Sequence, residues 1–173
     1  MKLCEAMALL IGVAIVALAT APGGAPRAGF QAAENPDVIE IRQYVLTLDK
    51  AQKTAKAMFV VNRLVQSDPS LNAAMDAGSS TTGRKPITLQ AKDIDANYPQ
   101  IAAIIHANGL STREFLVATS AIINDLGLVG MKKQGLIQTY PPNSITPGNA
   151  ALIEQNWAAF QAIGAEMSPP SSR

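Results

Sequence analysis

Apolar residues recur at helical spacing through most of the chain, and polar breaks divide the pattern into segments. The first long segment covers about residues 47–66, where an apolar residue takes every third or fourth position of one face. This stripe consists of Leu48, Ala51, Ala55, Met58 and Val65. Asp68 and Pro69 end the segment and, as N-cap and first helical residue, predict a short helix that carries Leu71 and Met75.

A polar loop over residues 78–86 separates these helices from a second helical region. That region covers about residues 89–107, and its apolar stripe is Ile94, Tyr98, Ile101 and Ile105. We expect Pro99 to split the region into two pieces, because proline lacks a backbone N–H and clashes with the preceding turn. Asn108 and Gly109 are typical of a helix C-terminus.

The third helix has the clearest start in the chain. Ser111 and Glu114 have the spacing of a capping box, in which the serine hydroxyl accepts from the amide three residues on and the glutamate reaches back. The helical pattern runs to about Lys133, and Gly135 ends it. Its apolar face is broad, which predicts a central and well-buried helix; the face comprises Phe115, Leu116, Ile122, Ile123, Leu126 and Val129.

The last helix begins at its N-cap Thr146 and continues to about Glu166. Its apolar stripe is Ile153, Trp157, Phe160 and Ile163. We expect Trp157 to be largely buried against the third helix, where Gly127 and Gly130 allow a neighbour to approach closely.

Strand signals are weak. Residues 38–48 alternate in places between apolar and polar side chains, which predicts a short extended lead-in to the first helix. One strand cannot form a sheet. The sequence therefore predicts an all-α fold, a compact bundle of four main helices plus a short helix, after an N-terminal signal segment.

The N-terminal pattern is that of a secretory signal. Lys2 precedes an uncharged apolar run over residues 6–21, which is closer to the signal core of about 7–15 residues than to the 20 or so residues of a spanning helix. Small residues at Ala17 and Ala19 fit cleavage, residues 31–33 offer a later site, and an uncleaved membrane anchor is the alternative. We expect signal peptide and flexible linker over residues 1–33, a helical domain over residues 34–167 and a disordered tail over residues 168–173.

Cysteine content and charge exclude several functions. Cys4 is the only cysteine, and it precedes the apolar run, so the mature domain would hold no disulfide, thiol nucleophile or cysteine metal site. From Glu34 onward twelve Lys and Arg residues balance twelve Asp and Glu residues. A nucleic-acid-binding domain usually carries a clear basic excess, so we expect no nucleic-acid partner.

Candidate chemistry is sparse. His106, the only histidine, lies near a predicted helix C-terminus and is a weak candidate ligand for haem or another cofactor, although a capping role fits it better. A metal site needs three or four ligands that the sequence does not group together, so we expect no metal and no cofactor. The glycines of residues 78–85 lack the Lys-Ser/Thr order of a phosphate loop. No serine has a convincing base, and we assign no catalytic residue.

Four segments together resemble a family of small, exported, uncharacterised proteins from Gram-negative bacteria. They are residues 109–115 (GLSTREF), 131–135 (MKKQG), 140–143 (YPPN), and 145–147 continuing through 153–157 (ITP, IEQNW). Members share a Gly-Leu-Ser/Thr-x-Arg-Glu helix start and a Thr/Ser-Pro-x-Asn start to the last helix. The resemblance covers the C-terminal third to half of the chain. It implies export and a helical layout, and it implies no activity.

We expect a periplasmic or secreted, non-enzymatic binding or interaction module, whose partner is an unknown protein or a small apolar ligand. A helical bundle of this size can enclose an apolar pocket. The first alternative is a structural or accessory subunit of a cell-envelope complex. The second is a hydrolase or haem protein that uses His106. Membrane contact is expected only through the N-terminal segment, if it stays uncleaved.

Overall fold

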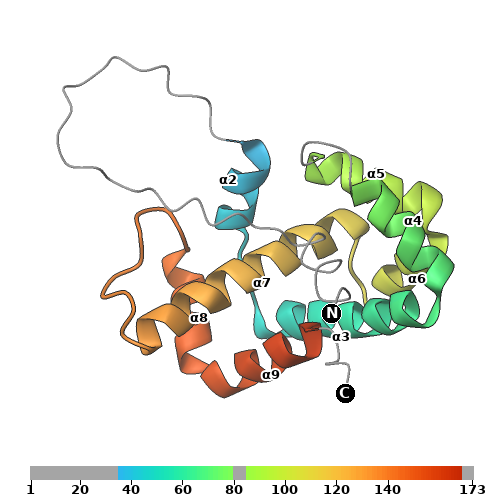
Figure 1. Cartoon of the computed structure of the whole chain (residues 1–173). Helices are drawn as coiled ribbons and strands as arrows, with labels where there is room; N and C mark the ends of the chain where they lie inside the picture. Colours follow the sequence, from blue (N-terminus) through green and yellow to red (C-terminus); the bar gives the residue numbers. More distant parts are fainter. Residues whose placement is uncertain (1–34, 80–84, 169–173) are drawn as a thin grey trace, which may run out of the picture.

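The computed structural model describes residues 35–79 and 85–168, which form helices and no strand (Figure 1). The all-α prediction is confirmed, while the described residues contain more and shorter helices than four plus one. In chain order the helices are α2 (Pro36–Gln43), α3 (Leu48–Ser67), α4 (Pro69–Ser79), α5 (Ile87–Asn97), α6 (Pro99–Ala107), α7 (Thr112–Lys133), α8 (Pro147–Gln155) and α9 (Trp157–Met167). The predicted signal segment lies outside the described residues.

Helix α7 is the centre of the fold, as its broad apolar face predicts. It packs against α2, α3, α5, α6, α8 and α9, and Figure 1 shows it crossing the middle of the molecule with α2 on one side and α3 on the other. Ala118, Ala121, Ile122 and Val129 are fully shielded from solvent. In the described part of the chain, α7 is also the helix long and apolar enough to cross a membrane. Its burial among its neighbours is that of a core helix.

The ends of α7 follow the sequence signals closely. The Ser111 hydroxyl accepts from the Glu114 amide at 3.1 Å, so Ser111 is the N-cap. The Glu114 carboxylate turns instead toward Tyr44 and Lys50, so only half of the expected capping box is observed. At the other end Gly135 adopts φ +74°, and the amide of Leu136 bonds to the carbonyl of Met131 inside the helix. This is a Schellman ending, which glycine allows.

The predicted starts of α3 and α4 and the break between α5 and α6 also hold, and α4 extends further than expected. Thr47 caps α3. The Asp68 carboxylate accepts from the Ser70 hydroxyl and from the amides of Leu71 and Ser70, which lowers the pKa of Asp68 and starts α4. The polar loop was predicted to begin at residue 78, but α4 continues through Ser79, and residues 80–84 lie outside the described part. Pro99 separates α5 from α6 as expected.

The predicted extended lead-in is wrong for most of its length, because residues 36–43 form helix α2. Asn35 caps this helix through a bond from the Asp37 amide, and Pro36 takes its first position. No residue of α2 is buried. Its helical form therefore depends on contacts to other elements, among them the bond from the Ile87 amide to the Asp37 carboxylate at 2.8 Å. Only residues 44–47 remain extended, as the link from α2 to α3.

The predicted last helix is broken in two at Asn156. The Asn156 side chain donates to the Leu152 carbonyl at 2.9 Å, and its backbone leaves the helical region with φ −114° and ψ +34°. An asparagine side chain competes for backbone bonds in this way. Trp157 therefore starts a new helix, where it is partly exposed and packs against the core. Its ring does face α7, since a Cβ added at Gly130 would lie 3.6 Å from it. Phe160 is fully buried.

The two aromatic residues of α9 should therefore contribute unequally to stability. We expect Phe160→Ala to lower the free energy of unfolding by about 3–5 kcal/mol, because it opens a cavity in the core. Trp157→Ala should cost clearly less, because part of its ring already contacts solvent. Urea denaturation followed by circular dichroism measures both. An equal or larger loss for Trp157→Ala would show that α9 packs differently from this structure.

Candidate functional site

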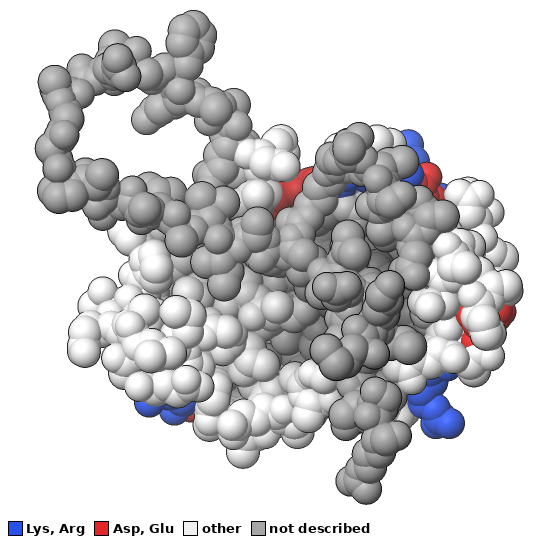
Figure 2. Space-filling view, in the orientation of Figure 1, with Lys and Arg blue, Asp and Glu red and all other residues white. Residues whose placement is uncertain are grey.

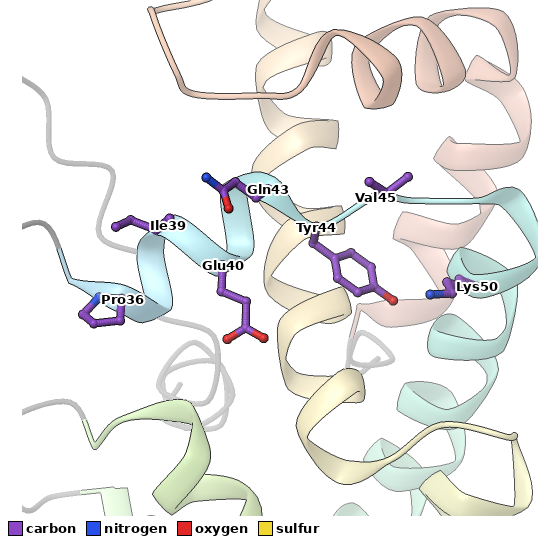
Figure 3. A pocket seen from close by; sticks show the side chains of 7 residues that line it. All are labelled: Pro36, Ile39, Glu40, Gln43, Tyr44, Val45 and Lys50. Carbon is purple, nitrogen blue, oxygen red and sulfur yellow. The ribbon is translucent and has the colours of Figure 1, made fainter.

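An open groove of about 530 Å³ lies beside α2 and the extended link that follows it (Figure 3). We call this the α2 groove. Its lining residues combine apolar and polar side chains and are Pro36, Ile39, Glu40, Gln43, Tyr44, Val45 and Lys50. The volume is in the range of about 300–1,000 Å³ that is usual for ligand sites. Large apolar side chains are exposed here, with Val45 at 69 % and Ile39 at 36 %.

An ion pair fastens α2 to α7 along one side of the groove. The two terminal guanidinium nitrogens of Arg113 contact the two carboxylate oxygens of Glu40, one of them at 2.6 Å, in a two-pronged arrangement. Such forked pairs fix geometry better than a single contact does. Arg113 occupies the first turn of α7, two residues after its N-cap. The start of α7 therefore sets the position of α2, and the Glu40 charge in the groove is neutralised.

A second polar group joins the link, α3 and α7. The Tyr44 hydroxyl donates to Glu114 at 3.1 Å, and the Lys50 ammonium pairs with the same carboxylate oxygen at 3.0 Å. Figure 3 shows the Tyr44 ring reaching toward Lys50, whose nitrogen lies 5.2 Å from the ring centre. Burial, followed by the Glu114 charge, raises the pKa of Tyr44, and the bond to Glu114 raises the pKa of Lys50. Tyr44 stays neutral and Lys50 stays charged.

The extended link is held by one buried side chain from α8. The Asn149 carbonyl accepts from the Leu46 amide at 3.0 Å, and its NH₂ group donates to the Tyr44 carbonyl at 2.8 Å. The two bonds lie on either side of Val45 along the chain. A residue of a neighbouring parallel strand would make the same pair of bonds. The same NH₂ group donates to the Asp125 carboxylate of α7 at 2.7 Å. Asn149 thus ties the link, α7 and α8 together.

Asp125 is a buried carboxylate without a cation beside it. It is 1 % exposed, and its partners are the amides of Asn149 and Asn124. Burial raises its pKa to about 6, against the two hydrogen bonds that lower it. As an ionised group it can only accept hydrogen bonds, so it holds the NH₂ group of Asn149 toward itself.

The arrangement around Asn149 leaves the other edge of the link open. Because successive peptide groups of an extended chain alternate in direction, the N–H and C=O of Val45 point away from Asn149. Among the described residues, none bonds to either of these two groups. Val45 therefore offers a backbone donor and acceptor beside its own exposed side chain at the α2 groove.

His106 lies outside the α2 groove, in the last turn of α6, and its side chain is exposed. Its ring nitrogen Nε2 is 3.3 Å from the hydroxyl of Thr112, which donates to Asp95. The Thr112 hydroxyl proton therefore points to Asp95 and not to the histidine. Thr112 is 2 % exposed, so this group braces the α5–α6–α7 junction and does not present a nucleophile to solvent.

Several other residues singled out in the sequence have local structural partners. Tyr140 of the proline-containing connector donates to Glu154 at 2.7 Å and packs partly against the core. Met58 of the first apolar stripe is buried in the core. In the part of the chain that the structure describes, no three His, Cys, Asp or Glu residues lie where they could hold a metal ion.

Sequence reasoning missed the groove and its supports. Asp125 falls three residues after Ile122 and four before Val129, so it shares their apolar face, and this was a visible signal of a buried carboxylate. Asn149 belongs to the Thr-Pro-x-Asn start of the last helix, which pointed only to a cap. No signal marked Glu40 and Arg113 as partners, because they lie on different elements.

No family model, curated protein or solved structure matches this chain. The resemblance to exported Gram-negative proteins therefore stays a prediction.

Asp125 gives the fold a specific pH dependence. Its pKa is about 6 when folded and about 3.9 when unfolded, so the folded state binds more protons between these values. The resulting contribution is fully present below pH 4 and is lost as the pH rises through 6, by about 2–3 kcal/mol. Denaturation of the wild type and Asp125→Asn from pH 4 to pH 7 isolates it, because the variant cannot ionise at this position. A constant difference between the two proteins would contradict the assignment.

Proposed function

We propose that this chain is an exported, non-enzymatic binding module and that the α2 groove holds a short, uncharged, extended peptide segment. The observation that carries the proposal is the open backbone edge of Val45 beside exposed apolar side chains. Peptides commonly add to such an edge through main-chain hydrogen bonds, while neighbouring pockets select their side chains. Such a peptide segment belongs to the unknown protein partner that the sequence analysis expects.

The charges around the groove favour a neutral ligand. Glu40 is neutralised by Arg113, and Lys50 by Glu114. A charged ligand would have to compete with these ion pairs, whereas an uncharged segment need not. The remaining contact surface comes from Pro36, Ile39 and Val45, which suit apolar side chains.

The same polar groups argue against the enzymatic alternative. A catalytic acid or base needs a proton it can exchange with a substrate near the working pH. The raised pKa values of Tyr44 and Lys50 keep both protonated, and each is already engaged with Glu114. The haem or hydrolase alternative is not supported at His106, because the ring is exposed and its neighbour, Thr112, is buried.

A structural subunit of an envelope complex would be favoured by one large apolar face. The exposed large apolar residues of the described part lie on different elements, with Phe59 and Val60 on α3, Leu89 on α5 and Leu136 after α7. Only Ile39 and Val45 share a groove. The distribution therefore favours a local binding site over a long assembly face.

Export remains part of the proposal and rests on the N-terminal sequence pattern. Lys2, the apolar run of residues 6–21 and the small residues that follow predict a periplasmic or secreted location. A fold whose described part contains no cysteine suits such a location, because it needs no disulfide chemistry to mature.

Affinity selection from a library of capped, uncharged hexapeptides tests the binding function, with fluorescence anisotropy of the enriched peptides. Val45→Pro removes the free N–H, and Tyr44 already has the φ −64° and ψ +123° that a following proline prefers. We expect this variant to bind about tenfold more weakly, because the peptide carbonyl loses its donor. Val45→Thr keeps the backbone and the shape and should bind within about threefold of the wild type.

Leu89→Ser is the matched control for the loss of an exposed apolar residue elsewhere, since Leu89 is 50 % exposed on α5. It should bind peptide as the wild type does. The proposal is wrong if the library yields no peptide that distinguishes the wild type from Val45→Pro.

A further inference from the structure

The end of the molecule formed by residues 134–165 is almost free of charge. Glu154 is the only charged residue in this stretch, which contains the connector after α7, helix α8 and most of α9. We call it the neutral lobe. Figure 2 shows the corresponding side of the molecule as largely white, with a small patch of charged atoms at its lower edge. The lobe is not hydrophobic throughout, because its polar residues are amides, serines and threonines.

Two lysines at the end of α7 border this lobe. Lys132 pairs with Glu154 at 2.9 Å and lies 4.6 Å from the centre of the Tyr140 ring. The bonds from Lys132 and Tyr140 lower the pKa of Glu154, so its charge is kept and balanced. Lys133 lies 5.3 Å from the centre of the Trp157 ring, and no carboxylate of the described residues pairs with it. Because the charges of Lys132 and Glu154 balance, Lys133 gives this edge of the lobe a net positive charge.

Leu136 projects from the lobe next to these lysines. It follows Gly135 in the Schellman ending of α7, a position where an apolar residue usually folds back onto the last helical turn. Here it is 67 % exposed instead. The bond from its amide to the Met131 carbonyl at 2.9 Å fixes the backbone that presents it. An exposed leucine thus follows Lys133 by three residues, at the helix end whose two lysines lie over the Tyr140 and Trp157 rings.

We propose that the neutral lobe docks on the surface of an anionic phospholipid bilayer, with Leu136 inserted and Lys133 at the headgroup phosphates. Each residue type has a matching depth: leucine among the acyl chains, tryptophan and tyrosine at the headgroup level, and lysine at the phosphates. A lobe with a single, balanced carboxylate offers no excess negative charge to repel the surface. A single projecting leucine suits insertion into lipid better than it suits a flat protein interface, which needs a broad buried centre.

This surface is separate from the α2 groove and from the N-terminal segment, where the sequence placed all membrane contact. A domain held in this way would keep the groove available to peptides while it stays at a membrane. The interaction is weak and reversible, because one leucine and one net charge carry it.

Quenching of Trp157 by brominated phospholipids tests the proposal on the full chain, because Trp157 is the only tryptophan. The N-terminal segment is common to all variants, and Trp157 reports only on its own surroundings. We expect quenching in vesicles of phosphatidylglycerol mixed with phosphatidylcholine, and much less in phosphatidylcholine alone. Leu136→Ser should lower the apparent affinity about tenfold. Lys133→Gln should lower it about fivefold, in the anionic vesicles alone.

Two controls make the outcome decisive. Leu89→Ser loses an exposed leucine far from the lobe and should be quenched as the wild type is. Val45→Pro should also be quenched normally, so failure of peptide binding and failure of lipid docking are distinguishable. Absence of bromine-dependent quenching, equal quenching without the anionic lipid, or no effect of Leu136→Ser would each overturn the proposal.

Discussion

The carboxamide of Asn149 meets three partners from two parts of the chain, the extended link and α7, and most of the candidate site depends on how it is oriented. Asp125 beneath it is buried and, when ionised, can only accept hydrogen bonds, so the NH₂ group must face α7. The carbonyl of the same side chain must then face the Leu46 amide. If the side chain were turned over, two donors would meet at Leu46 and two acceptors at Asp125, and buried groups would be left without partners.

The orientation of Asn149 affects the surface through helix α2, which other elements hold in position. Helix α2 buries no residue, so its own sequence contributes little to its position. One of its ends is set by the link that Asn149 grips, and its middle is set by the forked ion pair from Glu40 to Arg113. The residues that line the groove therefore lie at the surface and are held by polar contacts. These contacts depend in turn on the packing of α7 against α8.

The sequence predicted what depends on local chemistry and missed what depends on distant partners. The caps at Asp68, Ser111 and Thr146 and the break at Pro99 are predicted from neighbouring residues, and the structure has all four. Helix α2 was mistaken for an extended segment although Asn35 and Pro36 mark its start, because it buries no residue and its partners Ile87 and Arg113 lie far along the chain. The break at Asn156 arises because an asparagine side chain wins a backbone carbonyl, and periodicity alone does not reveal this. The groove is composed of such features, so its location could not be predicted although the all-α class could.

The candidate site depends on the two edges of one extended link, and amide hydrogen exchange at Val45 and Leu46 tests this dependence most directly. Leu46 donates to Asn149 and is 5 % exposed, whereas Val45 is 69 % exposed and without a described partner. The Leu46 amide should exchange as slowly as the core of α7, and the adjacent Val45 amide should exchange almost freely until a bound peptide slows it. Rapid exchange at both amides, or equal protection of both in the free protein, would contradict the account.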